Sequence, residues 1–372
     1  MRGDGPVAVS PPSGADPEPL DPVPTEAIAS DGCTASDGTP GPHRRPRVIP
    51  DLGRAGEQAP SQPAREHGQA GPTPAHSRCG TVALIVFEPH ALIFSDPFLP
   101  RLTIGVDATL RERRMHFVLL APQSEADCDW AEEYVVAGHA DGAMLVSFPG
   151  SSPLPGHLAA HGIPVVFGGR PTETDRVGYV DVDNVTGAAH AIAHLVSGGR
   201  RTIATITGHP DVHAAQDRLR GYRQGLTAAG LPADEGLIGA GDFTREDGAR
   251  AMRLLLSQRP LLDAVFAASD LMAAGALKAL TEAGRRVPED VAVVGYDDDP
   301  MAASLQPPLT SVRQPIERMG REMAAMLVNA IHSPDRSPGA VMLSTRLEVR
   351  LSSAPVAGAG PSANPPSAGP AG

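Results

Sequence analysis

Residues 263–296 read DAVFAASDLMAAGALKALTEAGRRVPEDVAVVGY, and this stretch is the clearest indication of the fold. Two aliphatic runs, at 263–267 and 291–295, flank a helical stretch at 270–283. Apolar runs without polar alternation are typical of strands that are covered on both faces, as in parallel sheets. The order strand, helix, strand therefore predicts a βαβ unit.

The same alternation runs from Gly80 to about residue 295 and predicts a doubly wound α/β architecture. Because sheets of more than about ten strands tend to split, we expect two lobes, the second starting near YVDVDN at 179–184. Ligands of such sheets bind outside the carboxyl ends of the strands, so two facing lobes predict a hinged cleft for a small molecule. The other predicted elements are strands at 82–86, 116–120, 142–147, 164–167 and 202–206 and helices at 215–229, 244–256 and 315–331.

Composition and charge restrict the class of protein. A chain of 372 residues with 41% hydrophobic residues can build two or three domains. No apolar run approaches the ~18 residues of a membrane span, and the amino terminus lacks a signal-like pattern, so we expect a cytoplasmic protein without membrane contact.

The three cysteines, Cys33, Cys79 and Cys128, are expected to be reduced. A net charge of −12 means that any DNA contact needs a separate basic module.

The first 79 residues differ in composition from the rest of the chain. They contain 15 Pro, 10 Gly and no Phe, Trp or Tyr. Such a segment buries too little apolar surface to offset the entropy cost of ordering, so we predict disorder. Its basic cluster at 43–47 is interpreted as a solvated charge run in preference to a DNA-contacting arm.

Catalytic signatures are absent from the sequence. It contains no G-x-S-x-G elbow, no phosphate-binding G-x-x-x-x-G-K-[ST] loop, no H-E-x-x-H and no dinucleotide-binding G-x-G-x-x-G. His190 and His194 lack a third metal ligand, and the acidic run at 297–299 lacks the ligand spacing of a calcium or magnesium site. We therefore predict a binding protein, not an enzyme, with no cofactor and no metal.

Polar residues near strand ends are the candidates for ligand contact. Asp297 follows a predicted strand and is expected to accept hydrogen bonds from ligand hydroxyls, although it or either of the next two aspartates can instead cap the segment 299–305. Ser269 is expected to cap the helix at 270–283 and to line the cleft at the same time. Arg218 either reaches the ligand with its planar guanidinium or forms a surface salt bridge.

Aromatic residues make up only 3% of the chain, which is low for a carbohydrate site. Phe94 and Phe98 follow the first strand, and Phe148 follows the third, so all three stand at expected cleft positions. Phe167 and Phe266 end strands, where they can equally be core residues.

Several motifs, in order, resemble the effector domains of the LacI/GalR (lactose and galactose repressor) family. The similarity is continuous from Gly80 to about residue 353, roughly three quarters of the chain, with a longer first loop than usual. The motifs include ADGAMLV at 140–146, VDVDNVTGAAHAIAHLVSGGRRTIATITG at 180–208, DRLRGYRQGL at 217–226 and VPEDVAVVGYDDDPMAASLQPPLTSVRQP at 287–315.

The resemblance implies a two-lobed fold like that of type I periplasmic binding proteins, with a small effector that is commonly a sugar. Arg218 matches the arginine of R-x-x-G-[FYW], a ligand contact, and Asp297 matches the first aspartate after G-[YF]. Ser269 stands where the family often has asparagine, so its side chain is shorter. Gln314 matches a glutamine near a lobe crossover, and Phe98 ends the loop after the first strand. With Phe148, these residues form the predicted ligand-binding set.

The resemblance also implies domain boundaries and a homodimer. The chain is expected to cross between lobes near residues 183, 313 and 343, with the helix at 315–331 near the dimer interface. The expected domains are a disordered segment at 1–79, lobe 1 at 80–183 and 314–342, lobe 2 at 184–313 and 343–353, and a disordered tail at 354–372.

Family members begin with a helix-turn-helix headpiece and a hinge helix that bind DNA, and neither pattern is recognisable in 1–79. We hypothesise that this segment reflects a frame-shifted or mis-started reading of a headpiece-coding region. DNA is thus a partner expected from the family alone. The predicted function is a regulator in which a ligand bridges Arg218 and residues near Phe98 and closes the cleft. The alternatives are a sugar-binding protein without a headpiece and an exported solute-binding receptor.

Overall fold

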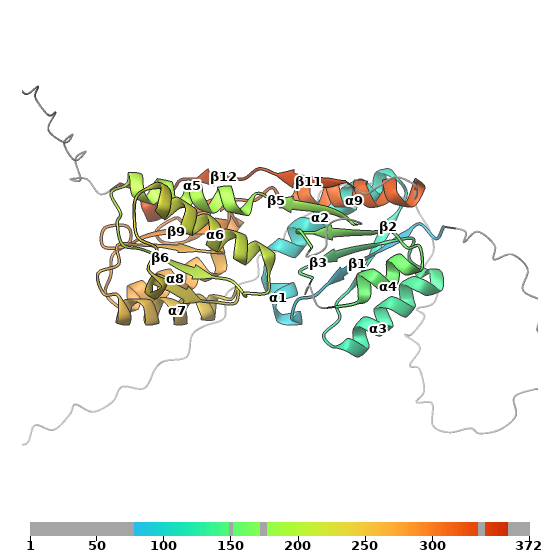
Figure 1. The fold of residues 1–372 in the computed structure, drawn as a ribbon, viewed down its shortest axis with the longest axis horizontal. Coiled ribbons are helices and arrows are strands. Elements are labelled where there is room, and N and C mark those ends of the chain that lie inside the picture. The colour runs from blue at the N-terminus through green and yellow to red at the C-terminus, as the bar shows by residue number, and fades with distance from the viewer. Residues whose placement is uncertain (1–77, 149–151, 172–176, 334–338, 356–372) are drawn as a thin grey trace, which may run out of the picture. The chain divides into compact units, whose positions relative to one another are not determined.

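The computed structural model describes residues 78–148, 152–171, 177–333 and 339–355. The disorder predicted for 1–79 and 354–372 falls almost entirely outside these residues. The predicted fold class is confirmed, because the described residues form two parallel-sheet α/β lobes (Figure 1). Among these residues, no helix combines the length and the apolar character that crossing a membrane requires.

Lobe 1, drawn at the right of Figure 1, is built on a six-stranded sheet in which every pair is parallel. The order of strands matches that of a doubly wound sheet, with β1 next to both β2 and β3. Across the sheet the strands are β11 (Ala340–Leu343), β5 (Gly178–Val182), β4 (Val165–Gly168), β3 (Ala143–Val146), β1 (Thr81–Val86) and β2 (His116–Leu120).

Lobe 2, at the left of Figure 1, repeats this plan with one antiparallel edge strand, β12. Consecutive elements show where the chain passes between the sheets: from β5 into α5, from β10 into α9 and from β11 into β12. The strands across this sheet are β12 (Arg346–Glu348), β10 (Thr310–Arg313), β9 (Ala292–Asp297), β8 (Ala264–Ala267), β6 (Ile203–Thr207) and β7 (Ile238–Ala240).

Helices cover both faces of each sheet. Polar caps fix several of their starts: the Ser124 side chain accepts a hydrogen bond from the Asp127 amide, and that of Thr244 accepts one from the Asp247 amide. The helices of lobe 1 are α1 (His90–Ser95), α2 (Phe98–Glu112), α3 (Glu125–Tyr134), α4 (Leu154–Ala160) and α9 (Ile316–His332), and those of lobe 2 are α5 (Asn184–Ser197), α6 (His213–Ala228), α7 (Arg245–Gln258) and α8 (Asp270–Glu282).

Strand β1 shows why an unbroken apolar run forms a central strand. Val82 and Leu84 belong to a core with residues of α2 and α9, whereas Ala83 and Ile85 face a second core that includes residues of α3 and α4. Residues 82 to 86 are all at most 1% exposed. Because both faces need apolar side chains, the sequence shows no alternation.

The backbones of helices α2 and α9 approach each other closely where the helices cross, at one glycine of each helix. A Cβ atom on Gly105 would lie 1.9 Å from the carbonyl oxygen of Glu317, and one on Gly320 would lie 2.2 Å from that of Leu102. Any side chain would therefore push the two helices apart. This close crossing holds α9, which follows a lobe crossover, against the sheet of lobe 1.

Five strands were missing from the sequence prediction: β5, β7, β10, β11 and β12. Two of them are only three residues long, and β5 and β10 carry buried polar residues that interrupt the apolar pattern. The strand predicted at 291–295 also continues to Asp297. Asp297 is therefore the last residue of β9 instead of following it.

Candidate ligand-binding site

A pocket between the two lobes is lined by residues of both. It contains about 1120 Å³ of space that no atom fills, part of it open to solvent. Its lining residues cluster at the carboxyl ends of β3, β4, β5, β8 and β9, as expected for facing α/β lobes. All six residues of the predicted ligand-binding set, Phe98, Phe148, Arg218, Ser269, Asp297 and Gln314, line this one pocket.

Arg218 lies at the centre of a polar network on the lobe 2 side. Its residue exposure is only 5%, which rules out the alternative of a surface salt bridge. The guanidinium donates to Asn184 Oδ1 at 2.9 Å and to the Ala268 carbonyl, and it lies 3.7 Å above the centre of the Tyr296 ring. Helix α6 therefore presents a fixed, desolvated cation to the pocket.

Asp297 is held between this cation and Gln314, which lies between β10 and α9, where the chain passes from lobe 2 to lobe 1. Its carboxylate lies 3.5 Å from Arg218 Nη1 and accepts a hydrogen bond of 2.5 Å from Gln314 Nε2. Burial raises the pKa of Asp297 well above its usual value, and the nearby Arg218 offsets this only in part. In its protonated form, Asp297 can donate as well as accept a hydrogen bond. No side-chain cap is formed by Asp299 at the start of the short helix Pro300–Ser304.

Ser269 performs the capping task that was predicted for it. Its Oγ accepts a hydrogen bond of 3.2 Å from the Met272 amide at the start of α8, and the residue also lines the pocket. The adjacent Asp270 is fully buried and accepts hydrogen bonds from the Asp299 amide and the Ser311 hydroxyl. Burial raises the pKa of Asp270 to about 8 and that of Asp299 to about 6. Together, Asp270 and Asp299 therefore carry less negative charge at neutral pH than two fully ionised carboxylates would.

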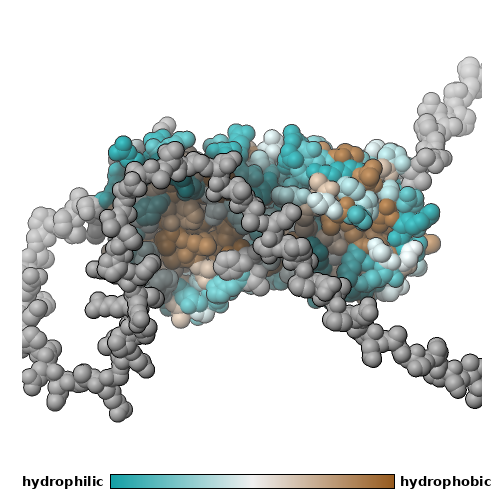
Figure 2. All heavy atoms as spheres, turned by 180° about the vertical axis from the view of Figure 1, so that it is seen from behind, coloured by the Kyte–Doolittle hydropathy of each residue, from teal (hydrophilic) through white to brown (hydrophobic). Residues whose placement is uncertain are grey.

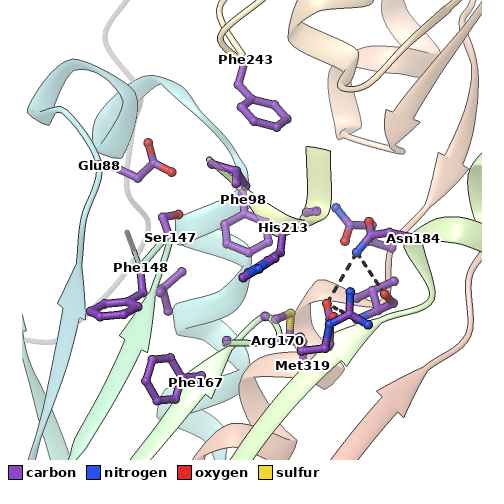
Figure 3. Close-up of a pocket in the computed structure, with 18 of the residues that line it drawn as sticks. Glu88, Phe98, Ser147, Phe148, Phe167, Arg170, Asn184, His213, Phe243 and Met319 are labelled. Carbon is purple, nitrogen blue, oxygen red and sulfur yellow. Dashed lines mark hydrogen bonds between the residues drawn. The ribbon is translucent and has the colours of Figure 1, made fainter. Parts of the chain in front are cut away.

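The aromatic residues face the polar network across the pocket. Phe148 packs edge-on against Phe87 and Phe167, each at 5.3 Å between ring centres. Figure 3 shows Phe148 and Phe167 on one side, Asn184 on the other and Phe243 above them. The arrangement provides apolar faces and hydrogen-bonding edges, which are the two features that a sugar ring also has.

Several lining residues were missed by sequence reasoning. Phe243 comes from a segment between a three-residue strand and α7 that has no periodic pattern. Phe243, Ser147 and Asp297 all line the pocket with positive φ angles of 59°, 52° and 107°, a backbone conformation that costs energy outside glycine. Asn184 stands in the motif YVDVDN, which was recognised only as the start of the second half.

The described residues offer no sign of metal chemistry. They contain no group of three or more His, Cys, Asp or Glu side chains that could hold a metal ion. His194, one half of the histidine pair, bonds Ser353 Oγ at 2.7 Å, and burial lowers its pKa.

Two parallel sheets whose strand ends meet around a polar and aromatic pocket define a two-lobed ligand-binding domain. Residues 192–353 match the family described as periplasmic binding protein-like domain. The transcriptional regulator CelR of Thermobifida fusca is 47% identical over 277 residues, which are 74% of this chain and 82% of CelR. The Escherichia coli K12 ribose operon repressor is 32% identical over 243 residues, 64% of this chain and 73% of the repressor. The chain belongs to the LacI/GalR family of transcriptional regulators.

Solved structures agree with this assignment. A complex of CelR with cellobiose superposes with a TM-score of 0.72 at 47% identity and covers 74% of this chain and 85% of that one. A LacI family regulator from Enterococcus faecium with bound ribose has a TM-score of 0.66 at 26% identity, with 74% and 99% coverage. Both structures contain a bound sugar.

Proposed function

We propose that this protein regulates transcription in response to a small saccharide and that cellobiose is the first ligand to test. The observation that carries the proposal is the pocket itself, in which Arg218, Asp297 and Gln314 face a group of phenylalanines. The similarity to CelR, which has been solved with cellobiose, supports a disaccharide over a monosaccharide. By this proposal the protein is not an enzyme, because its relatives are transcriptional regulators and the buried Asp297 is already bound by Arg218 and Gln314.

In the proposed mechanism, the ligand favours a closed cleft. Hydroxyl groups of the sugar bind Arg218 and Asp297 of lobe 2, and its apolar faces pack on Phe98 and Phe148 of lobe 1. A ligand that contacts both lobes binds the closed form more tightly and shifts the population towards it. The crossover segments, at which the chain passes from one lobe to the other, transmit this shift to the DNA-binding part of the regulator.

We also propose that the protein acts as a homodimer, the usual form of regulators that read paired half-sites. Figure 2 shows hydrophobic residues gathered on the lobe 1 side of the face opposite to that of Figure 1. Large apolar side chains of lobe 1 that are exposed include Ile104 of α2 at 62% and Met342 of β11 at 51%. Burying such side chains between two copies would remove them from water.

A calorimetric titration of the full chain with cellobiose tests the proposed ligand. We expect saturable binding of cellobiose, and binding at least tenfold weaker for glucose and ribose, because a monosaccharide fills only part of the pocket. Arg253→Gln is the matched control, since it removes an exposed ion pair between α7 and α8 and should leave the affinity unchanged. Tighter binding of either monosaccharide would contradict the choice of a disaccharide.

A gel-shift assay at stated salt distinguishes the regulator from a ligand-binding protein without a DNA-binding part. We expect operator DNA to be bound in a salt-sensitive manner that cellobiose changes, and we expect this binding to be weak because no headpiece motif is recognisable in 1–79. Binding of sugar without any binding of DNA would favour the alternative.

A further inference from the structure

We propose that Arg170 and Asp217 form a clasp between the lobes that sets how far the cleft closes before any ligand arrives. The proposal rests on the ligand-binding function proposed above and adds a control on it. Arg170 follows β4 in lobe 1, and Asp217 lies on α6 in lobe 2. Arg170 Nη2 donates to Asp217 Oδ2 at 2.6 Å, so the pair is a direct contact between the two lobes.

The surroundings of this pair make it stronger than an ordinary surface ion pair. The side chain of Asp217 is only 6% exposed, whereas that of Arg170 is 32% exposed. A carboxylate withdrawn from water requires a nearby cation, because an unpaired buried charge is costly. Opening the cleft would take Arg170 away from Asp217, and this cost favours the closed form.

Arg170 also faces a carboxylate of its own lobe. Asp181, the fourth residue of β5, is 5% exposed and lines the pocket together with Arg170. Burial raises the pKa of Asp181, the positive charge of Arg170 lowers it, and the negative charge of Asp217 raises it again. The guanidinium therefore lies within electrostatic range of one acid from each lobe, so it has an alternative partner when the lobes separate.

Asp181 links the clasp to the ligand network, because it lies within electrostatic range of Arg170 and is hydrogen-bonded to Asn184. Asn184, the first residue of α5, donates from Nδ2 to Asp181 Oδ1 at 3.5 Å and accepts from Arg218 Nε at 2.9 Å. Figure 3 shows Arg170 and Asn184 on the same side of the pocket. A ligand that binds Arg218 therefore acts on the network that runs through Asn184 to Asp181, next to Arg170. In this proposal, Arg170 is a positioning residue for closure of the cleft.

The test is hydrogen–deuterium exchange of the ligand-free full chain, compared among the wild type, Arg170→Gln, Asp217→Asn and the double variant. We expect each single variant to exchange about fivefold faster at the pocket-lining segments 181–184 and 212–216, equivalent to ~1 kcal/mol. The double variant should add little to either single change, because both remove the same contact.

Arg220→Gln provides the matched control. Arg220 Nη1 lies 3.2 Å from the other oxygen of Asp217 but belongs to the same helix, so its removal changes the charge near Asp217 without breaking a contact between lobes. We expect the exchange of Arg220→Gln to equal that of the wild type at both segments.

Three results would overturn the clasp. The first is unchanged exchange in Asp217→Asn, and the second is additive changes in the double variant. The third is equal acceleration throughout lobe 2, because that pattern reports a loss of fold stability. A wild type that binds no sugar would count against the proposed function, while the ligand-free exchange would still report on the clasp.

Discussion

Replacing Arg218 with methionine is expected to weaken cellobiose binding about a hundredfold, equivalent to ~2.7 kcal/mol. Hydrogen bonds to a charged group contribute about 1.5–3 kcal/mol each, and the substitution also leaves Asp297 without the cation that lies 3.5 Å away. Methionine keeps an apolar stem over the Tyr296 ring, so the packing of α6 changes less than it would with alanine.

The measurement is calorimetric titration, with thermal unfolding run beside it to separate lost binding from lost folding. Arg218→Lys is the informative partner variant, because it keeps the positive charge but loses the planar fork that binds both Asn184 and Ala268. We expect its affinity to lie between those of Arg218→Met and the wild type. A dissociation constant of Arg218→Met equal to that of the wild type would remove this residue from the site.

Replacing Gly105 with alanine should lower the free energy of unfolding by about 3 kcal/mol. The added methyl group would lie 1.9 Å from the Glu317 carbonyl oxygen, so α2 and α9 must separate. Because α9 follows the crossover at Gln314, we expect the separation to loosen the hinge side of the pocket as well.

Gly156→Ala is the matched control for this prediction. Gly156 lies within α4, and a Cβ atom there would meet no atom within 4 Å. Since alanine favours helices over glycine by about 1 kcal/mol, the same chemical change should be neutral or stabilising there. Urea unfolding followed by circular dichroism measures both variants. Similar losses of stability in the two would show that the helix crossing is not the cause.

The sequence predicted those strands that carry apolar side chains on both faces, such as β1, β8 and β9. The sequence did not predict β10, because its fully buried residues Thr310 and Ser311 are polar. These hydroxyls are tolerated because each has a partner, such as Asp270 for Ser311. Asp270 lies 41 residues from Ser311 in the sequence, so a local hydrophobic pattern does not reveal the pair.

The site was predicted to the extent that its residues stand at strand ends or in family motifs. The motifs pointed to Arg218, Asp297 and Gln314, and the structure places all three at one pocket. Phe243 and Arg170 reach the pocket from segments without periodicity, so only the folded chain reveals them. The clasp between Arg170 and Asp217 likewise depends on how two lobes meet, which strand and helix patterns do not encode.

The central claim is that one saccharide binds both lobes across the cleft. Hydrogen–deuterium exchange of the full chain with and without saturating cellobiose tests it most directly. We predict slower exchange on both sides: at residues 86–98 and 146–148 of lobe 1 and at 212–218 and 267–270 of lobe 2. Protection confined to one lobe, or absent from both at saturation, would contradict this account.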